Sequence, residues 1–91
     1  MKIKFFATYR DITKCKEIDI SATPDIRALF NLLSDNYGTR MREKLYTPDG
    51  QGIGEDAIIL VNGRNVLHMG GLDSALKDSD IVSVFPLVAG G

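Results

Sequence analysis

Apolar and polar residues alternate in two short segments at the start of the chain. Between residues 2 and 9, apolar side chains stand at every second position with lysines between them, as in a strand with one buried face. Segment 16–20 alternates isoleucine with acidic residues in the same way. Because the linker at 10–14 is short and polar, the two strands are predicted to form an antiparallel hairpin.

A stripe of apolar residues at helical spacing follows. From Ile26 to Tyr37 the apolar side chains recur at i, i+3, i+4, i+7 and i+11, so one face of a helix must pack on another element. Thr23 is the expected N-cap, Pro24 suits the first helical position, and Gly38 supplies the stop. The surface available to this stripe is the predicted sheet.

Three further segments are predicted to be short turns or loops. Residues 39–45 can add one helical turn, and residues 72–76 suit another. Residues 46–56 contain three glycines, a proline and three acids, a composition typical of an exposed loop. We expect this loop to be mobile.

The remaining strands are predicted in the second half of the chain. Residues 57–61 form an aliphatic run that suits a strand buried on both faces or central in a sheet. Asn62-Gly63 then indicates a tight hairpin turn, because both positions tolerate positive φ. A short strand at 65–68 is predicted to pair back, and residues 81–85 form the last strand.

The predicted order is strand, strand, helix, strand, short strand, short turn and strand. A helix that crosses one face of a mixed sheet of four or five strands buries its apolar stripe and leaves the other face partly open. This is an α+β arrangement of the β-grasp, ubiquitin-like type. We expect residues 1–91 to form a single domain with a flexible arm at 86–91, since Pro86 cannot donate to a strand ladder.

Composition and charge narrow the class of protein. The chain has 91 residues, of which 44% are hydrophobic and 25% charged, the balance of a soluble globular domain. A formal net charge of -1 lacks the basic excess that nucleic-acid binding needs. No apolar run approaches the ~20 residues that span a bilayer, and the first residues lack a signal-peptide core. We therefore expect a cytoplasmic protein that binds neither nucleic acid nor membrane.

The sequence offers little material for catalysis or metal binding. A single cysteine cannot form an intramolecular disulfide, which agrees with a cytoplasmic location. Cys15 shares strand parity with the outward Glu17 and Asp19 and is expected to be an inert thiol, with a persulfide role as the alternative. His68 is expected to be structural, because metal sites need several converging ligands. We expect no bound cofactor, no metal and no independent enzyme activity.

The candidate chemistry lies at the end of the chain. After Pro86, residues 87–91 carry no charge, decrease in side-chain size and stop at two glycines. A carboxylate that must reach an ATP phosphate or a pterin inside another protein needs an extended arm with nothing bulky at its tip. Gly90 and Gly91 have no Cβ and adopt backbone angles barred to other residues. A frayed terminus without function is the alternative.

These features resemble the MoaD/ThiS family of ubiquitin-like sulfur carriers, and within it the small subunit of molybdopterin synthase. The resemblance covers nearly the whole chain. Its most specific part is Val84-Phe85-Pro86 leading into Val88-Ala89-Gly90-Gly91. The other matching residues are Phe5-Phe6-Ala7, Arg10, Val61-Asn62-Gly63, Leu76 and Asp80.

The resemblance implies a role in sulfur transfer. An ATP-using adenylyltransferase similar to ubiquitin-activating enzymes would adenylate Gly91, and a sulfurtransferase would supply sulfur to make a thiocarboxylate. The arm would then enter the large, catalytic subunit of molybdopterin synthase in a heterotetramer. There the sulfur would build the dithiolene of molybdopterin, for molybdenum cofactor biosynthesis. The implied partner-binding residues are Phe85, Pro86, Leu87, Val88 and Ala89.

The open sheet face near Phe85 and Leu87 is the expected docking surface, because exposed apolar patches commonly mark interfaces. Core packing of Phe85 is the alternative. The family usually has a second proline where Leu87 stands and commonly a glycine where Ser79 stands, and the loop at 46–56 is longer than in compact members. These departures leave the sulfur acceptor open.

Two other functions are therefore kept. The same thiocarboxylate chemistry can serve another acceptor, such as thiamin thiazole, cysteine or a thiolated tRNA, or the chain can be a ubiquitin-like modifier joined to lysines. The third possibility is a β-grasp binding module whose Gly-Gly end is incidental. Loss of Gly90-Gly91 would leave the activity of such a module intact, whereas a carrier would lose all activity.

Overall fold

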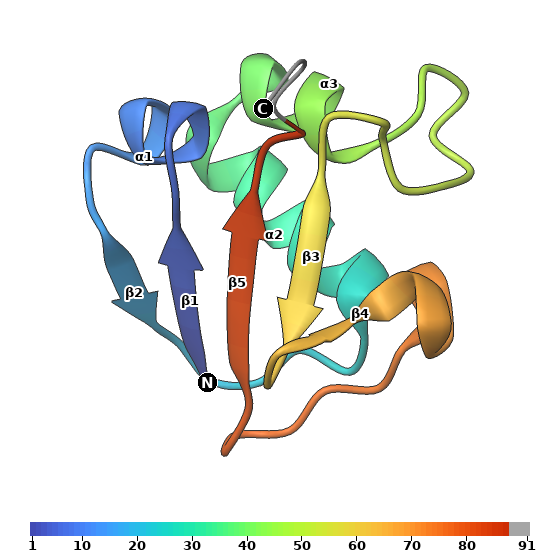
Figure 1. Cartoon of the computed structure of the whole chain (residues 1–91). Coiled ribbons are helices and arrows are strands. Elements are labelled where there is room, and N and C mark those ends of the chain that lie inside the picture. The colour runs from blue at the N-terminus through green and yellow to red at the C-terminus, as the bar shows by residue number, and fades with distance from the viewer. Residues whose placement is uncertain (88–91) are drawn as a thin grey trace.

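A five-stranded mixed sheet is the scaffold of the protein (Figure 1). The computed structural model describes residues 1–87, and residues 88–91 lie outside the described part. The strand order is β2-β1-β5-β3-β4, with β5 parallel to β1 and antiparallel to β3. This confirms the predicted β-grasp fold. The strands are β1 (Lys2–Phe5), β2 (Glu17–Asp19), β3 (Ile58–Val61), β4 (Arg64–Asn65) and β5 (Ile81–Phe85).

Helix α2 (Ile26–Tyr37) packs across one face of the sheet, as the apolar stripe predicts (Figure 1). Its stripe is buried from Ile26 to Leu33, and Tyr37 places its ring edge-on against Phe5 at a centroid distance of 6.1 Å. Each buried aliphatic side chain of the stripe contributes about 1.5–3 kcal/mol. Gly38, with a φ of 90°, ends the helix as predicted. The shorter helices are α1 (Thr8–Thr13) and α3 (Thr39–Leu45), and the latter is the helical turn predicted at 39–45.

The connection between β1 and β2 differs from the prediction. The two strands pair antiparallel, with Ile3 opposite Ile18, but they are joined by α1 and not by a polar hairpin turn. Strand β1 ends at Phe5, because Ala7 adopts φ 52° and ψ -124° and turns the chain into the helix. Tyr9, four residues before Thr13, then faces the core and is fully buried.

Helix α2 begins two residues later than predicted. Its N-cap is Asp25, whose carboxylate accepts a hydrogen bond from the Ala28 N–H at 2.9 Å. The predicted cap, Thr23, instead donates its hydroxyl proton to the Asp25 carbonyl at 3.1 Å. Asp25 also forms a β-bridge with Ala75, and this tertiary contact fixes where the helix starts.

The hairpin after β3 follows the prediction at its turn and departs from it afterwards. Asn62 and Gly63 have φ values of 53° and 83°, as an Asn-Gly turn requires. The predicted strand at 65–68 is wrong, since pairing stops at Asn65 and a 3₁₀ turn, Val66–His68, follows. Val66 there turns into the core and is fully buried. The helical turn predicted at 72–76 is a 3₁₀ turn at Gly71–Asp73.

Strand β3 lies next to the central strand β5 and is buried on one face only. Its burial alternates, with Ile59 and Val61 in the core and Ile58 and Leu60 half-buried on the other side. Of the two predicted placements, burial on both faces is wrong, whereas β3 does lie inside the sheet, paired with β5 and β4. The aliphatic side chains that the core does not use lie on the open face of the sheet.

Candidate functional site

The carboxyl-terminal arm leaves the fold from the middle of the sheet. Phe85 is the last residue of β5, which has β1 on one side and β3 on the other. Pro86 has no N–H to donate, so the strand ends where the sequence predicts. Leu87 follows and is 58% exposed. The remaining predicted site residues, Val88, Ala89, Gly90 and Gly91, lie outside the described residues.

The base of the arm is fixed by a pair of stacked aromatic rings. Phe6 and Phe85 lie nearly parallel, with an interplanar angle of 9° and a centroid distance of 4.1 Å. The Phe6 N–H donates to the Val84 carbonyl at 3.1 Å, which extends the parallel β1–β5 pairing by one residue. Phe85 is half-buried and lies outside the main core cluster. The structure thus places it on the open face of the sheet.

Arg10 of α1 lies over the Phe6 ring of this pair. Its guanidinium carbon is 5.8 Å from the centre of the Phe6 ring, and its Nε donates to the Phe5 carbonyl at 3.3 Å. Arg10 belongs to α1, the helix that the sequence did not predict. The resemblance to the family includes Arg10 among the matching residues, and the structure shows its contact with the Phe6 ring.

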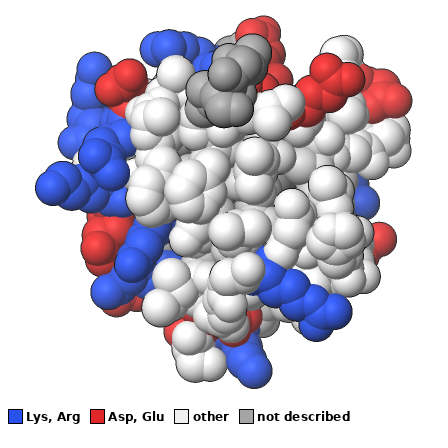
Figure 2. All heavy atoms as spheres, in the orientation of Figure 1, with Lys and Arg blue, Asp and Glu red and all other residues white. Residues whose placement is uncertain are grey.

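The open face of the sheet is uncharged at its centre. Phe85 of β5 stacks on Phe6 there, beside the side chains of β3 that point away from α2, and Figure 2 shows this white central area with charged groups around it. Ile58 is opposite Phe85 in the β3–β5 register, and Ile81 is 41% exposed. We call this surface the apolar face, and its members are Phe6, Ile58, Leu60, Ile81 and Phe85.

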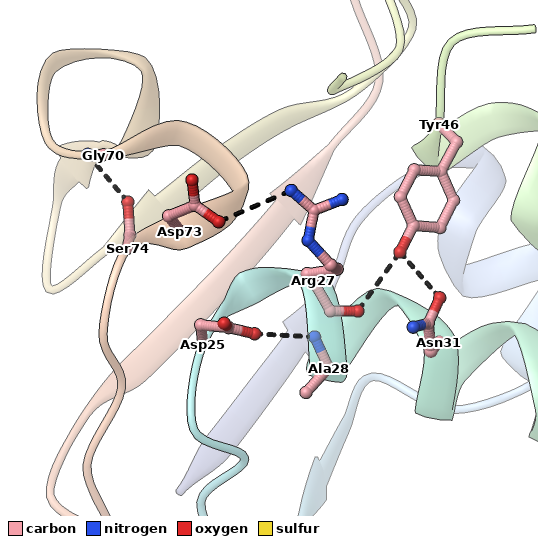
Figure 3. Close-up of polar contacts among 8 residues, drawn as sticks. All are labelled: Asp25, Arg27, Ala28, Asn31, Tyr46, Gly70, Asp73 and Ser74. Carbon is pink, nitrogen blue, oxygen red and sulfur yellow. Dashed lines mark hydrogen bonds and ion pairs between the residues drawn. The ribbon is translucent and has the colours of Figure 1, made fainter. Parts of the chain in front are cut away.

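The loop at 46–56 is anchored by Tyr46 at its first residue. Figure 3 shows the Tyr46 hydroxyl directed at α2, where it donates to the Arg27 carbonyl at 3.1 Å and to Asn31 Oδ1 at 2.7 Å. Burial raises the pKa of the Tyr46 phenol, and the Arg42 guanidinium, 4.8 Å from the ring centre, opposes that effect. The composition predicts an exposed loop but gives no sign of this anchor.

Hydrogen bonds within the loop hold its tip. The Thr47 N–H donates to the Gly52 carbonyl at 3.0 Å, and the Thr47 hydroxyl donates to Asp49 Oδ1 at 2.6 Å. That hydroxyl, followed by the Gln51 N–H, lowers the pKa of the Asp49 carboxyl. At the far end of the loop, Asp56 pairs with the Lys44 ammonium at 2.8 Å. The mobility expected for this loop stays a prediction.

Cys15 and His68 lie apart from the arm. Cys15 is half-buried and packs against the core. Its alternation with Glu17 and Asp19 predicts an outward side chain. Burial and then the neighbouring Cys15 thiol raise the pKa of Tyr37. His68 is exposed in the 3₁₀ turn after β4. Among residues 1–87, no three side chains of the metal-ligating types come together, and no helix is long and apolar enough to cross a membrane.

Comparison with known proteins identifies the family. The sequence profile of the ThiS family matches residues 3–91. The chain belongs to the ThiS family. It is 35% identical to small archaeal modifier protein 3 of Haloferax volcanii over 96 residues, which covers 100% of this chain and 98% of that protein.

Solved structures agree with this assignment. Over 96% of this chain and 95% of the other, it is 33% identical to a putative molybdopterin converting factor, subunit 1, from Pyrococcus furiosus, with a TM-score of 0.70. Small archaeal modifier protein 1 of Methanosarcina acetivorans is 27% identical over 99% of this chain and 94% of that chain, with a TM-score of 0.84. This ThiS-family chain is therefore a ubiquitin-like protein of the sulfur carrier and modifier type, which confirms the resemblance to the MoaD/ThiS family.

Proposed function

We propose that this ThiS-family protein is a sulfur carrier whose working group is the carboxylate of Gly91. The observation that carries the proposal is the course of β5. The central strand of the sheet ends at Phe85, and Pro86 releases the chain into an uncharged segment that stops at Gly90-Gly91. A group at the end of such an arm can enter the active site of another protein while the folded domain stays outside it.

The proposed chemistry has two steps, both catalysed by a partner. The Gly91 carboxylate attacks the α-phosphorus of ATP, pyrophosphate leaves, and an acyl-adenylate forms. A sulfide then attacks the acyl carbon and AMP leaves, which gives the thiocarboxylate. If the donor is a persulfide, the product is an acyl disulfide, and a thiol must reduce it to release the thiocarboxylate. Gly91 supplies the reacting carboxylate, and Gly90 precedes it in the arm. ATP is bound by the partner adenylyltransferase.

We propose that the sulfur acceptor is a pterin precursor, on which the delivered sulfur builds the dithiolene of molybdopterin. The phenylalanine-proline lead-in at Phe85 and Pro86 supports this choice, as does the likeness to the protein from Pyrococcus furiosus named a putative molybdopterin converting factor subunit. Catalysis would lie in the large subunit of molybdopterin synthase, with a sulfurtransferase as the source of sulfur. The apolar face around Phe85 and the exposed Leu87 would dock on these partners.

A protein modifier is the second candidate function. The relative from Haloferax volcanii, which matches the whole chain, is named a modifier protein. Both functions begin with adenylation of Gly91. They differ in the nucleophile that attacks the activated carbonyl, which is sulfur for a carrier and a lysine amine for a modifier. An isopeptide-linked ladder on denaturing gels would favour the modifier, whereas sulfur delivery to a pterin precursor would favour the carrier. Delivery to thiamin thiazole, cysteine or tRNA would keep the chemistry and change the acceptor.

The test is pyrophosphate exchange with the activating enzyme. Gly91→Ala is expected to fold normally and to lose adenylation, because an added Cβ crowds the channel that the arm must thread. Gly52→Ala is the matched control, since its Cβ would make only ordinary contacts, the nearest at 3.6 Å from Thr47 Cγ2. Normal adenylation of Gly91→Ala would contradict the threading argument, and activity after deletion of Gly90-Gly91 would support the binding-module alternative.

A further inference from the structure

A pocket lies at the end of the sheet opposite the arm. Its volume is about 430 Å³, which is in the range of ligand sites, and its apolar floor is formed by Val61, Met69 and Leu76. Because β3 and β5 are antiparallel, the turn after β3 and the start of β5 meet here, whereas the arm leaves from Phe85 at the other end (Figure 1). Among the described residues, the pocket shares none with the apolar face.

Hydrogen bonds hold one wall of this pocket, the segment from Met69 to Leu76. The Leu76 N–H donates to the Pro24 carbonyl at 3.1 Å, which ties the wall to the chain just before α2. Within the wall, the Gly70 N–H donates to the Ser74 hydroxyl at 2.9 Å, as Figure 3 shows. The wall is therefore formed before a ligand arrives, and little ordering of the chain opposes binding.

The charged residues of the pocket favour an anionic ligand. Arg64 and Lys77 line it and are exposed, and within the described part of the chain neither forms an ion pair. Asp80 also lines the pocket, but it is buried, and its carboxylate accepts from the Asn62 amide at 2.9 Å and from the Lys77 N–H at 3.0 Å. The Asp78 carboxylate accepts from a backbone N–H before α2 at 2.8 Å. The acids are thus engaged by protein donors, and the two cations remain open to a ligand.

An apolar floor beside two cations fits a ligand that is apolar along its length and ends in an anion. The arm has this chemistry, since residues 87–89 are apolar and Gly91 carries the carboxylate that the proposed function uses. To enter the pocket of its own copy, the arm would have to reverse and pass along β5, about 17 Å at ~3.4 Å per residue. Reversal uses at least two residues, and residues 88–91 then span at most about 14 Å. The arm of a second copy has no such limit.

We propose that the arm of one copy of this protein binds the pocket of a second copy, with the Gly91 carboxylate between Arg64 and Lys77. Residues 87–89 cover the apolar floor. The arm and the pocket are different surfaces of one copy, so the contact is heterologous, and its occupancy rises with protein concentration. A bound carboxylate is withheld from an activating enzyme, so self-association lowers the concentration of free arms. The inference shares with the proposed function only the free carboxylate of Gly91.

The test is an NMR titration of the isotope-labelled full chain, kept dilute, with a synthetic peptide of residues 86–91. Amide shifts of the pocket residues are expected to move with the free-acid peptide, and the C-terminal amide should bind about fivefold more weakly. A peptide with Leu87→Ser and Val88→Ser should bind about tenfold more weakly, because it buries less apolar surface. Without peptide, the same shifts should change with the concentration of the full chain, and deletion of residues 88–91 should stop that change.

Two double variants test the cations. Arg64→Gln/Lys77→Gln should lose the preference for the free acid over the amide. Arg40→Gln/Lys16→Gln, which removes an exposed arginine in α3 and an exposed lysine next to β2, should keep it. High salt should reduce the preference in the parent. Thermal unfolding establishes that the variants are folded.

Three results would overturn the inference. They are equal affinity for the free acid and the amide, shifts that fall outside the pocket, and a parent-like preference in Arg64→Gln/Lys77→Gln. Equal binding of the serine peptide would also contradict it, because the apolar floor would then contribute nothing. The titration contains no activating enzyme, so its failure would leave the proposed function untouched, and failure of adenylation would not affect the titration.

Discussion

The ring of Phe6 lies flat against the ring of Phe85, with centroids 4.1 Å apart, at the point where β5 ends and the arm begins. This contact joins two residues 79 positions apart in the sequence (85 minus 6) and lies outside the main core cluster. It links the fold to the arm, because Phe85 is followed directly by Pro86. The position of Phe85 at the end of β5 therefore depends on a half-exposed contact.

The aromatic pair can be tested by a double-mutant cycle. Phe6→Leu and Phe85→Leu should each lower the free energy of unfolding by about 1 kcal/mol, with a coupling between them of about 0.5–1.5 kcal/mol. Urea denaturation measures each term. Phe6→Leu combined with Leu60→Ala is the control, since β5 separates their strands and their effects should add. Additive effects for Phe6 and Phe85 would show that the stack contributes nothing beyond burial.

Ala7 offers a test of backbone strain. It adopts φ 52° and ψ -124°, which a residue with a Cβ rarely occupies, and its side chain is exposed. Ala7→Gly should therefore raise the free energy of unfolding by about 1 kcal/mol, the strain relieved less the added entropy of the unfolded chain. The matched substitution Ala28→Gly in α2 should lower it by about 1 kcal/mol. Equal losses for both variants would contradict the strain at Ala7.

Gly54 is predicted to be indispensable for packing. A Cβ at this position would lie 2.8 Å from the Lys44 carbonyl oxygen and 3.0 Å from the Tyr46 carbonyl oxygen, both backbone atoms that cannot move independently. Gly54→Ala should cost about 2 kcal/mol by thermal or urea unfolding. Gly52→Ala, in the same loop, should cost nothing or stabilise slightly. A harmless Gly54→Ala would mean that the loop is not held against α3.

The raised pKa of Tyr9 predicts that the free energy of unfolding falls in alkali. Burial, and then the Asp56 carboxylate, raise the pKa of its phenol above the value of about 10 found in unfolded chains. The folded state thus retains this proton when the unfolded state releases it, so the stabilisation is complete below about pH 10 and decreases as pH rises further. The hydroxyl donates to the Asp56 and Lys44 carbonyls at 2.5 and 3.3 Å.

Tyr9→Phe isolates this effect from other groups that titrate in alkali. At neutral pH it should lower the free energy of unfolding by about 1–2 kcal/mol through lost hydrogen bonds. Between pH 9 and 11 the gap between the parent and Tyr9→Phe should narrow, because Phe has no proton to lose. Urea unfolding across that range measures the gap, and parallel curves would contradict the assignment to Tyr9.

Much of the fold follows from local pattern. The stripe from Ile26 to Tyr37 specifies α2, Gly38 ends it, and Asn62-Gly63 sets the β3–β4 turn. Each of these signals depends on residues close in sequence. Pro86 also predicts where the strand before it ends, and β5 does end at Phe85.

The elements that the sequence does not reveal depend on contacts between distant segments. Helix α1 is too short and polar for a helical stripe, and it forms because buried Tyr9 reaches the carbonyls of Lys44 and Asp56. The anchor of Tyr46 on α2 depends likewise on tertiary packing. For the candidate site, the resemblance to the family named Phe85 and Arg10, but the ring contact that relates them through Phe6 required the fold.

The most direct test of the central claim is intact mass spectrometry of this protein after incubation with its activating enzyme, ATP and a sulfur source. The account predicts exchange of one terminal oxygen for sulfur, confined to the C-terminal peptide and absent without ATP. An unchanged mass, with no acyl-adenylate formed, would contradict the carrier function and leave the Gly90-Gly91 end incidental.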